Sequence, residues 1–158
     1  MPPSGGENRY FLKASNSVTV EAWVTPSSLS LTGPARILDL SKNNAQRNLV
    51  FGQSGNRYET QLKTSTTTAS LQSPAASLTL NLAHVVYTRD SSGQAVYYIN
   101  GVQVSSQTTT GNLSSWGTDH ALTLSDTWRG TYFLVAVYSR ALSGAEVQQN
   151  YLAGVNGN

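Results

Sequence analysis

Hydrophobic and polar residues alternate along most of the chain in short runs that are typical of β-strands. The segment Ser17–Val24 has small apolar residues at every second position, with Thr19, Glu21 and Trp23 between them. Because successive side chains of a strand point to opposite faces, this segment predicts one apolar and one mixed face. The same pattern predicts strands at Arg9–Ala14, Ala35–Leu40, Asn48–Gly52, Tyr58–Thr64, Ala83–Arg89, Ala95–Asn100, Val102–Ser106, Ala121–Leu124 and Tyr132–Tyr138.

Turn signals separate these strands and indicate how they are joined. Asn100-Gly101 lies between two predicted strands, and both residue types tolerate a positive φ, so a two-residue hairpin is expected there. Many short strands with tight turns and no helices between them predict an all-β, antiparallel two-sheet sandwich or a barrel. The Ser- and Thr-rich stretch 64–79 fits either a strand or a long loop.

One short helix is predicted near the C-terminus. Ser143 and Glu146 have the spacing of a capping box, in which each side chain accepts a hydrogen bond from an unpaired amide at the helix start. We expect this helix to pack on one edge of the sandwich through Val147, Tyr151 and Leu152.

Composition narrows the class of protein. The chain has 158 residues, enough for one core but short for two domains, and only 11% of them are charged, with a net charge of +2. There is no cysteine, which excludes disulfides, zinc–thiolate sites and thiol nucleophiles. The basic residues form no cluster, so no nucleic-acid partner is expected. No apolar run approaches the roughly 20 residues of a membrane helix, so no membrane insertion is expected.

The domain is expected to span residues 9–155, between a linker-like segment at 1–8 and a tail at 156–158. The first segment is rich in proline and glycine and shows no signal peptide. We therefore expect a module that is part of a larger multidomain protein. The cysteine-free composition, rich in Ser, Thr and Asn, fits an extracellular or cell-surface location.

Four stretches carry a resemblance to a known family. Ser17–Val24 is similar to the strand sfTvEaWvkp, Ala83–Asp90 to WhHvAvtyD, and Tyr98–Gly101 to the hairpin YvDG. Trp128–Gly130 followed by Val137–Val147 is similar to f.G.iddvriYnRALsaaEv. In this order, the stretches resemble the bacterial laminin G-like domains of the concanavalin A-like lectin/glucanase superfamily.

The resemblance implies a jelly-roll sandwich and a non-catalytic, secreted module that binds glycans or proteins, in many members with a calcium ion. The chain departs from the family pattern at Asn100, which replaces the hairpin aspartate, at Leu82, where tryptophan is usual, and at 132–135, where two acids are missing. Asp119 and Asp126 are the best candidates for calcium ligands. Two interpretations of these aspartates stay open: they are calcium ligands, or they are solvated turn residues.

An enzymatic function would require residues in patterns that support catalysis. A retaining glycosidase needs two carboxylates about 5 Å apart, hence acids at i and i+2 or i+4 of one strand. Glu21 and Glu59 are solitary, and His84 and His120 lack the partners that related polysaccharide lyases use. No G-x-S-x-G nucleophile elbow occurs. No catalytic residue is therefore predicted, and a polysaccharide-active enzyme is kept as the second alternative.

The leading prediction is a carbohydrate-binding module whose partner is a polysaccharide or another glycan. Sugar binding needs aromatic rings and planar polar groups on an outer sheet face or on rim loops. The candidates on strands are Glu59, Gln61 and Lys63, which share one face, and Tyr87, Arg89 and Tyr97, which alternation allows on a single outer face. The candidates on the rim are Trp116, Trp128 and Arg129, besides Asp119.

Core packing is the competing interpretation of every aromatic residue. It is favoured for Trp23, whereas Tyr97 and Trp116 are the best aromatic candidates for ligand contact. The first alternative function is a protein-interaction or adhesion module on the same fold, with a polypeptide as its ligand.

Overall fold

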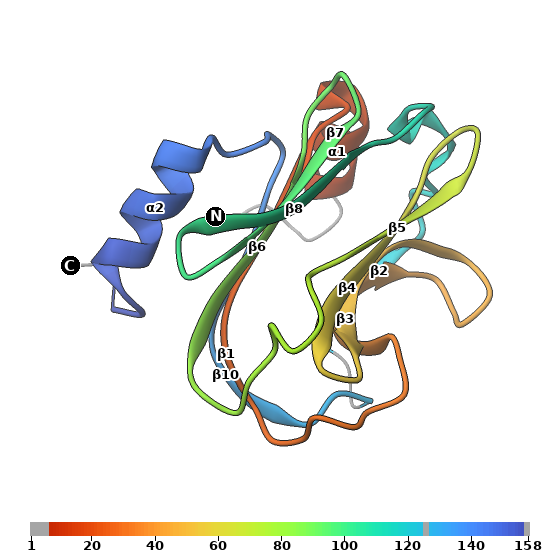
Figure 1. Ribbon diagram of the computed structural model, residues 1–158. Helices are drawn as coiled ribbons and strands as arrows, with labels where there is room; N and C mark the ends of the chain where they lie inside the picture. The colour runs from red at the N-terminus through yellow and green to blue at the C-terminus, as the bar shows by residue number, and fades with distance from the viewer. Residues whose placement is uncertain (1–6, 125–126, 157–158) are drawn as a thin grey trace.

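Two antiparallel five-stranded sheets face each other across a hydrophobic core (Figure 1). The computed structural model describes residues 7–124 and 127–156. Sheet A has the strand order β10-β1-β6-β7-β8, and sheet B the order β5-β4-β3-β2-β9. The predicted all-β, two-sheet sandwich of the jelly-roll type is therefore confirmed.

The observed strands agree with the alternation pattern at nine of its ten predicted positions, β1 included. Sheet A contains β1 (Val18–Pro26), β6 (Ala83–Arg89), β7 (Gln94–Ile99), β8 (Val102–Thr108) and β10 (Gly130–Tyr138). Sheet B contains β2 (Ala35–Ser41), β3 (Arg47–Ser54), β4 (Arg57–Lys63), β5 (Thr68–Gln72) and β9 (Ala121–Leu124). The stretch 64–79 thus holds one strand, β5, and a loop after it.

The hairpin between β7 and β8 has the predicted geometry. Asn100 has a φ of 51° and Gly101 a φ of 80°, as a two-residue primed turn requires. The Asn100 side chain also accepts a hydrogen bond from the backbone N–H of His84 on the neighbouring strand, at 2.9 Å. The asparagine therefore stabilises both the turn and its attachment to the neighbouring strand, β6.

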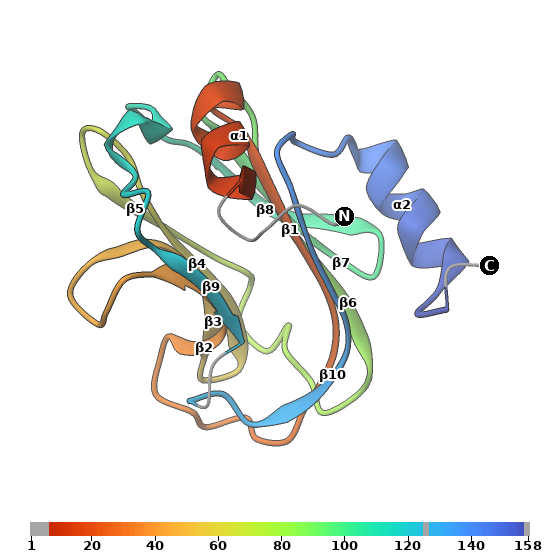
Figure 2. The same cartoon turned by 180° about the vertical axis from the view of Figure 1, so that it is seen from behind.

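The N-terminal segment is a helix, α1 (Glu7–Ser15), and the predicted strand at Arg9–Ala14 is wrong. Leu12 enters the core with 3% of its surface exposed, and Lys13 Nζ donates a hydrogen bond to the carbonyl of Trp116. α1 lies beside the short 3₁₀ turn η1 (Leu113–Ser115) and closes one end of the sandwich (Figure 2). These tertiary contacts decide the conformation of a segment whose local pattern is ambiguous.

The domain bounds at residues 9 and 155 stay a prediction. α1 begins at Glu7, two residues inside the segment predicted as a linker, and residues 1–6 and 157–158 lie outside the described residues. Among the described residues, no helix has both the length and the hydrophobicity that crossing a bilayer requires.

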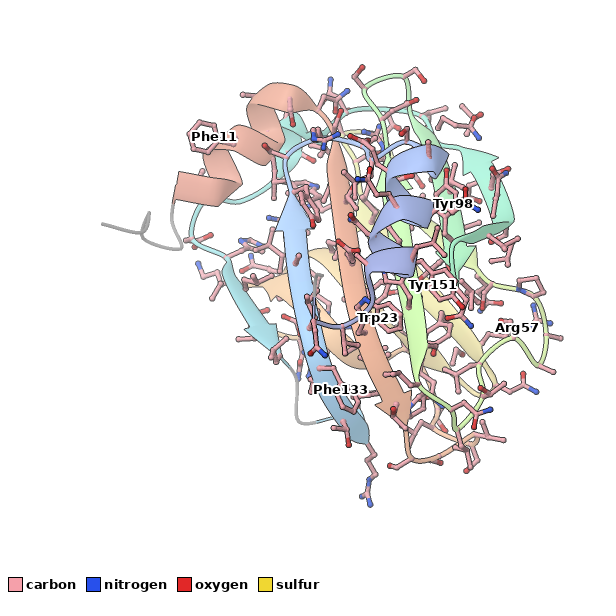
Figure 3. The ribbon with its side chains drawn as sticks, turned by 90° about the vertical axis from the view of Figure 1, so that its left-hand side faces the viewer. Phe11, Trp23, Arg57, Tyr98, Phe133 and Tyr151 are labelled. Carbon is pink, nitrogen blue, oxygen red and sulfur yellow. The ribbon has the colours of Figure 1, made fainter. Side chains whose placement is uncertain are left out.

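The second helix, α2 (Gly144–Ala153), packs on the outer face of sheet A rather than on an edge (Figure 3). Its capping box is present as predicted. Val147 is fully buried, and the Tyr151 ring stacks on Trp23 with a centroid distance of 5.8 Å. Leu152 is 75% exposed, so its predicted packing role is wrong.

Both faces of strand β1 are consequently buried. Its apolar residues, such as Val20, face sheet B and the main core, whereas Glu21 and Trp23 face α2. Trp23 is a core residue, as predicted, but it belongs to the layer between sheet A and α2. Sheet A is therefore the middle layer of the molecule.

A buried polar group lies in that layer. Glu21 is 3% exposed, and one of its carboxylate oxygens lies 2.6 Å from Nε2 of His84. Its other oxygen accepts hydrogen bonds from the Tyr138 hydroxyl at 2.7 Å and from the Asn150 amide on α2 at 3.3 Å. Burial raises the pKa of Glu21, but these hydrogen bonds outweigh it, so the pKa is lowered overall.

The lowered pKa makes stability depend on pH. A carboxyl whose pKa is lower in the folded state stabilises the fold above its unfolded pKa, about 4.3, and this contribution is lost as the pH falls through the folded value. We predict that Glu21→Gln reduces the free energy of unfolding at pH 7 by about 1.5–3 kcal/mol, because hydrogen bonds to a charged group are lost. Below about pH 4 the difference should shrink.

Urea unfolding between pH 2.5 and 7 measures both effects. Asp119→Asn is the control, because Asp119 is exposed and its ion pair is screened by solvent. An equal loss in both variants, or none in Glu21→Gln, would contradict the stabilising role of the buried carboxylate.

Candidate functional site

The outer face of sheet B carries polar side chains, and none of the described helices covers it (Figures 1 and 2). Pairing between β4 and β5 places Glu59 opposite Gln72 and Gln61 opposite Ser70. Tyr58, Leu62 and Leu71, which alternate with these residues, are in the core. The alternation of the two strands therefore directs four polar side chains outward in two adjacent pairs.

These four residues, Glu59, Gln61, Ser70 and Gln72, form a hydrogen-bonded group that we name the polar row. The Glu59 carboxylate accepts from Gln61 Nε2 at 3.1 Å and from the Ser70 hydroxyl at 2.9 Å through one oxygen. Its other oxygen accepts from Gln72 Nε2 at 3.1 Å. Glu59 is 7% exposed, so the carboxylate is held in place by its neighbours.

The two glutamine amides are oriented by this group. Each uses its NH₂ group to donate to Glu59, which directs its carbonyl oxygen away from the carboxylate. Neither carbonyl oxygen accepts a hydrogen bond from another described residue. The polar row therefore offers two fixed acceptors to a ligand that brings hydroxyl or amide donors.

A hollow lies on the same sheet, towards β2 and β3. Its volume is about 390 Å³, and we name it the arginine hollow. It is lined by residues 31–36 and by Asn44, Arg47 and Thr127. Arg36 Nη1 lies 3.1 Å from Asp39 Oδ2 and donates to Asn44 Oδ1 at 3.1 Å. The Arg47 side chain has no partner among the described residues, and its Nε is buried.

Asp39 and Val50 connect the two features across the sheet. Gln61 pairs with Val50, which in turn pairs with Asp39. Asp39 is 3% exposed and accepts a hydrogen bond from the Thr123 hydroxyl at 2.8 Å besides its ion pair with Arg36. Since neighbouring strands are about 4.8 Å apart, Gln61 on β4 and Asp39 on β2 are about 10 Å apart.

The predicted group Glu59, Gln61 and Lys63 does share the outer face of sheet B. Glu59 and Gln61 belong to the polar row, whereas the exposed Lys63 side chain lies one pair further along β4. Alternation with the core residues Tyr58 and Leu62 fixes this placement.

Tyr87, Arg89 and Tyr97 share one face as predicted, but it is the inner face, and the predicted outer placement is wrong. Both tyrosine rings are in the main core, edge to face with centroids 5.6 Å apart. Arg89 is fully buried, and its guanidinium donates to the Thr109 hydroxyl and to the carbonyls of Asn16 and Gly111. It connects loops at one end of the sandwich, and burial lowers its pKa.

Trp116 and Trp128 are also buried, so their predicted exposure on the rim is wrong. Trp116 is 2% exposed and donates from Nε1 to the carbonyl of Lys63 at 2.6 Å. Trp128 is 5% exposed and donates to Gln53 Oε1 at 2.9 Å. Tryptophan combines a large apolar ring with one donor, which suits these closed ends. Arg129 is exposed just before β10, apart from the polar row and the lining of the hollow.

The calcium prediction rests on two aspartates, of which Asp126 lies outside the described residues. Asp119 is 57% exposed, and its carboxylate lies 2.6 Å from Lys42 Nζ and 3.1 Å from His120 Nδ1. The hydrogen bond from Lys42 is the main cause of its lowered pKa. The described residues contain no group of three metal-ligating side chains, and an ammonium beside Asp119 does not fit a calcium ligand. Calcium stays a prediction.

Five residues of the polar row and the hollow were not among the sequence-based candidates: Ser70, Gln72, Arg36, Asn44 and Arg47. The first two lie in the stretch for which strand and loop were both open, so their face was not assignable. Arg36 precedes a bulge in β2, and Asn44 lies in the turn before β3. The sequence signal for the hollow is the presence of two arginines, Arg36 and Arg47, in the β2–β3 hairpin.

Comparisons with known proteins agree with the fold. A sequence profile described as the Concanavalin A-like lectin/glucanases superfamily matches residues 7–148. No curated protein sequence matches the chain.

Several solved structures share the sandwich. A putative carbohydrate binding protein from Bacteroides ovatus aligns with a TM-score of 0.65 and 16% identity over 87% of this chain and 41% of that one. The binding domain of botulinum neurotoxin DC, solved with rat synaptotagmin II, aligns with a TM-score of 0.67 and 16% identity over 89% of this chain and 36% of its own.

A third structure comes from work on botulinum neurotoxin type C, whose cell entry depends on two ganglioside molecules. It aligns with a TM-score of 0.67 and 18% identity, over 93% of this chain and 38% of its own. The chain thus spans 36–41% of the length of these three proteins. At such identities the likeness shows the fold alone.

The buried aromatic residues lead to a prediction about stability. The Tyr97 hydroxyl lies 2.5 Å from Thr60 Oγ1 inside the core. Tyr97→Phe should lower the free energy of unfolding by about 1 kcal/mol, because Thr60 loses its buried partner. Ligand binding should not change.

Urea unfolding of Tyr97→Phe, Thr60→Val and the double variant tests this. The double variant should lose less than the sum of the single losses, because removing both partners leaves no unpaired group. Strictly additive losses, or a binding defect without a stability loss, would contradict the buried placement.

Proposed function

We propose that this chain, which belongs to the concanavalin A-like lectin/glucanases superfamily, is a non-catalytic module that binds glycans through the outer face of sheet B. The superfamily match covers most of the chain, and the face in question carries the polar row and the arginine hollow. Together these features support a binding surface for a hydroxyl-rich ligand.

The orientation of Gln61 and Gln72 is the observation that carries the proposal. Because Glu59 holds both NH₂ groups, the two carbonyl oxygens keep a fixed direction without a ligand. Fixed acceptors lose little conformational entropy on binding, which raises affinity. Glycan hydroxyl groups are donors that match such acceptors, and Ser70 adds a hydroxyl between the two amides.

The same contacts argue against catalysis at this face. Glu59 is committed to three hydrogen bonds, and Asp39 is committed to Arg36 and Thr123. A glycosidase requires a carboxylic acid with a raised pKa beside a second free carboxylate. Away from this face, the carboxyl groups of Glu21 and Asp119 have lowered pKa values, which do not suit a catalytic acid. We therefore propose binding without hydrolysis.

The proposal also concerns the larger protein that contains the module and where that protein is located. In the similar structures the aligned region is part of a longer chain. One is a binding domain of botulinum neurotoxin DC in complex with rat synaptotagmin II, and another concerns the interaction of botulinum neurotoxin type C with two ganglioside molecules. We propose that the chain is one module of a larger protein at the cell surface or outside the cell. A location outside the cell would give it access to polysaccharides.

The proposal predicts which substitutions weaken binding. Gln61→Ala and Gln72→Ala should each lower the affinity for a bound glycan about five- to tenfold, because each removes one hydrogen bond of about 1 kcal/mol. Glycan-array screening identifies the glycan, and isothermal titration calorimetry with the purified chain measures the affinities.

Gln103→Ala is the matched control, because Gln103 is an exposed glutamine on β8 of the other sheet. It should bind like the parent protein. Equal losses in all three variants, or no glycan bound at all, would contradict the proposal.

Calcium is tested in the same screen. The polar row needs no metal, so binding that depends on it should persist in a chelator. Binding that disappears in a chelator and in Asp119→Ala would instead assign the function to a calcium-dependent rim site.

A second candidate is a protein-interaction module. Leu122 and Leu124 are 49% and 55% exposed on β9, which among the described residues pairs only with β2 and lies at the edge of sheet B. An apolar edge strand of this kind can pair with a strand of another protein. In that case Leu122→Lys would abolish binding and Gln61→Ala would not.

A further inference from the structure

The arginine hollow carries more positive than negative charge. Arg36 and Arg47 line it, and no carboxylate is among its described lining residues. Asp39 neutralises Arg36 at 3.1 Å, which leaves the charge of Arg47 unbalanced. The hollow therefore attracts an anionic group.

Arg47 also lacks hydrogen-bond acceptors. Its guanidinium makes no hydrogen bond to a described residue, and its Nε is buried. A guanidinium has five donors, and a buried donor without an acceptor is unfavourable. Carboxylate and sulfate groups offer two or three oxygens with the spacing of this planar group. An oxyanion in the hollow would thus satisfy Arg47.

The remaining walls of the hollow suit a sugar that carries this anion. Leu31, Pro34 and Ala35 supply apolar surface, and Thr32 and Asn44 supply polar groups. Arg36 is fixed by Asp39 and Asn44, and its backbone N–H donates to the Thr127 hydroxyl at 2.9 Å. The volume of about 390 Å³ is within the range of small-molecule sites, roughly 300–1,000 Å³.

We infer that the ligand is an anionic glycan, whose carboxylate or sulfate group binds Arg47 in the arginine hollow while neighbouring hydroxyl groups bind the polar row. This inference rests on the proposed function. In this arrangement the arginine hollow recognises the charged group, and the polar row recognises the hydroxyl groups. Arg47 lies on β3 three residues before Val50, the partner of Gln61, so a chain of two or three sugar units spans the roughly 11 Å between the backbones of Arg47 and Gln61.

The test uses paired probes on an array: oligogalacturonates, their methyl esters, sulfated galactans and unsulfated galactans. Charged members of each pair should bind at least about tenfold more tightly than their neutral partners, because a hydrogen-bonded ion pair is lost. Binding of the charged members should weaken as sodium chloride is raised from 50 to 500 mM. Comparing the oligogalacturonates with the sulfated galactans shows whether the bound anion is a carboxylate or a sulfate group.

Two variants locate the effect. Arg47→Gln should reduce the affinity for the charged probe about tenfold or more and abolish its salt dependence. Arg140→Gln removes the same charge near α2, where Arg140 pairs with Glu146, and should bind like the parent protein. Thermal unfolding of both variants checks that they are folded. The parent protein's preference for charged probes tests the inference even if Arg47→Gln is unstable.

The outcomes separate this inference from the proposed function. If neutral and charged probes bind equally and Gln61→Ala still weakens both, the module binds glycans but the anionic specificity is wrong. If Arg140→Gln weakens binding as much as Arg47→Gln, the effect is general electrostatics and the hollow is not the site. If no probe and no glycan on the array binds, both proposals are wrong.

Discussion

The packing of α2 on sheet A is the constraint on which the rest of the structure depends. Tyr151 covers Trp23 and His84, and Asn150 reaches the buried carboxylate of Glu21. Sheet A thereby becomes a middle layer whose strands β1 and β6 are buried on both faces, and their aromatic residues serve packing. None of the described helices covers the outer face of sheet B, and we assign ligand binding to this face.

Sheet B combines a rigid support with a polar surface. Its inner side contributes Phe51, Tyr58 and Leu62 to the core, which holds the strands in place. On its outer side, the hydrogen bonds of Glu59 orient Gln61 and Gln72 before any ligand arrives. A site built on strands is positioned more accurately than one built on loops. This accuracy favours recognition of hydroxyl geometry over broad apolar contact.

The sequence predicted the sandwich, the hairpin at Asn100 and the capped helix, because each depends on local alternation or on turn and capping chemistry. It could not determine which face of a strand meets solvent. Tyr87 and Tyr97 do lie together, but they face the main core and not solvent, so alternation predicted the grouping and not the exposure. The hollow around Arg47 depends on the bulge in β2 and on contacts between distant segments, which leave no local signal.

The most direct test of the central claim is amide chemical-shift mapping of the ¹⁵N-labelled chain with a bound glycan. If the glycan binds sheet B, the largest shifts will occur on β2 to β5, around Gln61, Ser70 and Arg47. Residues of α2 and of the inner face, such as Tyr97, should shift little. Shifts concentrated on the edge strand β9 or on α2, with β4 and β5 unchanged, would contradict the assignment of the site to sheet B.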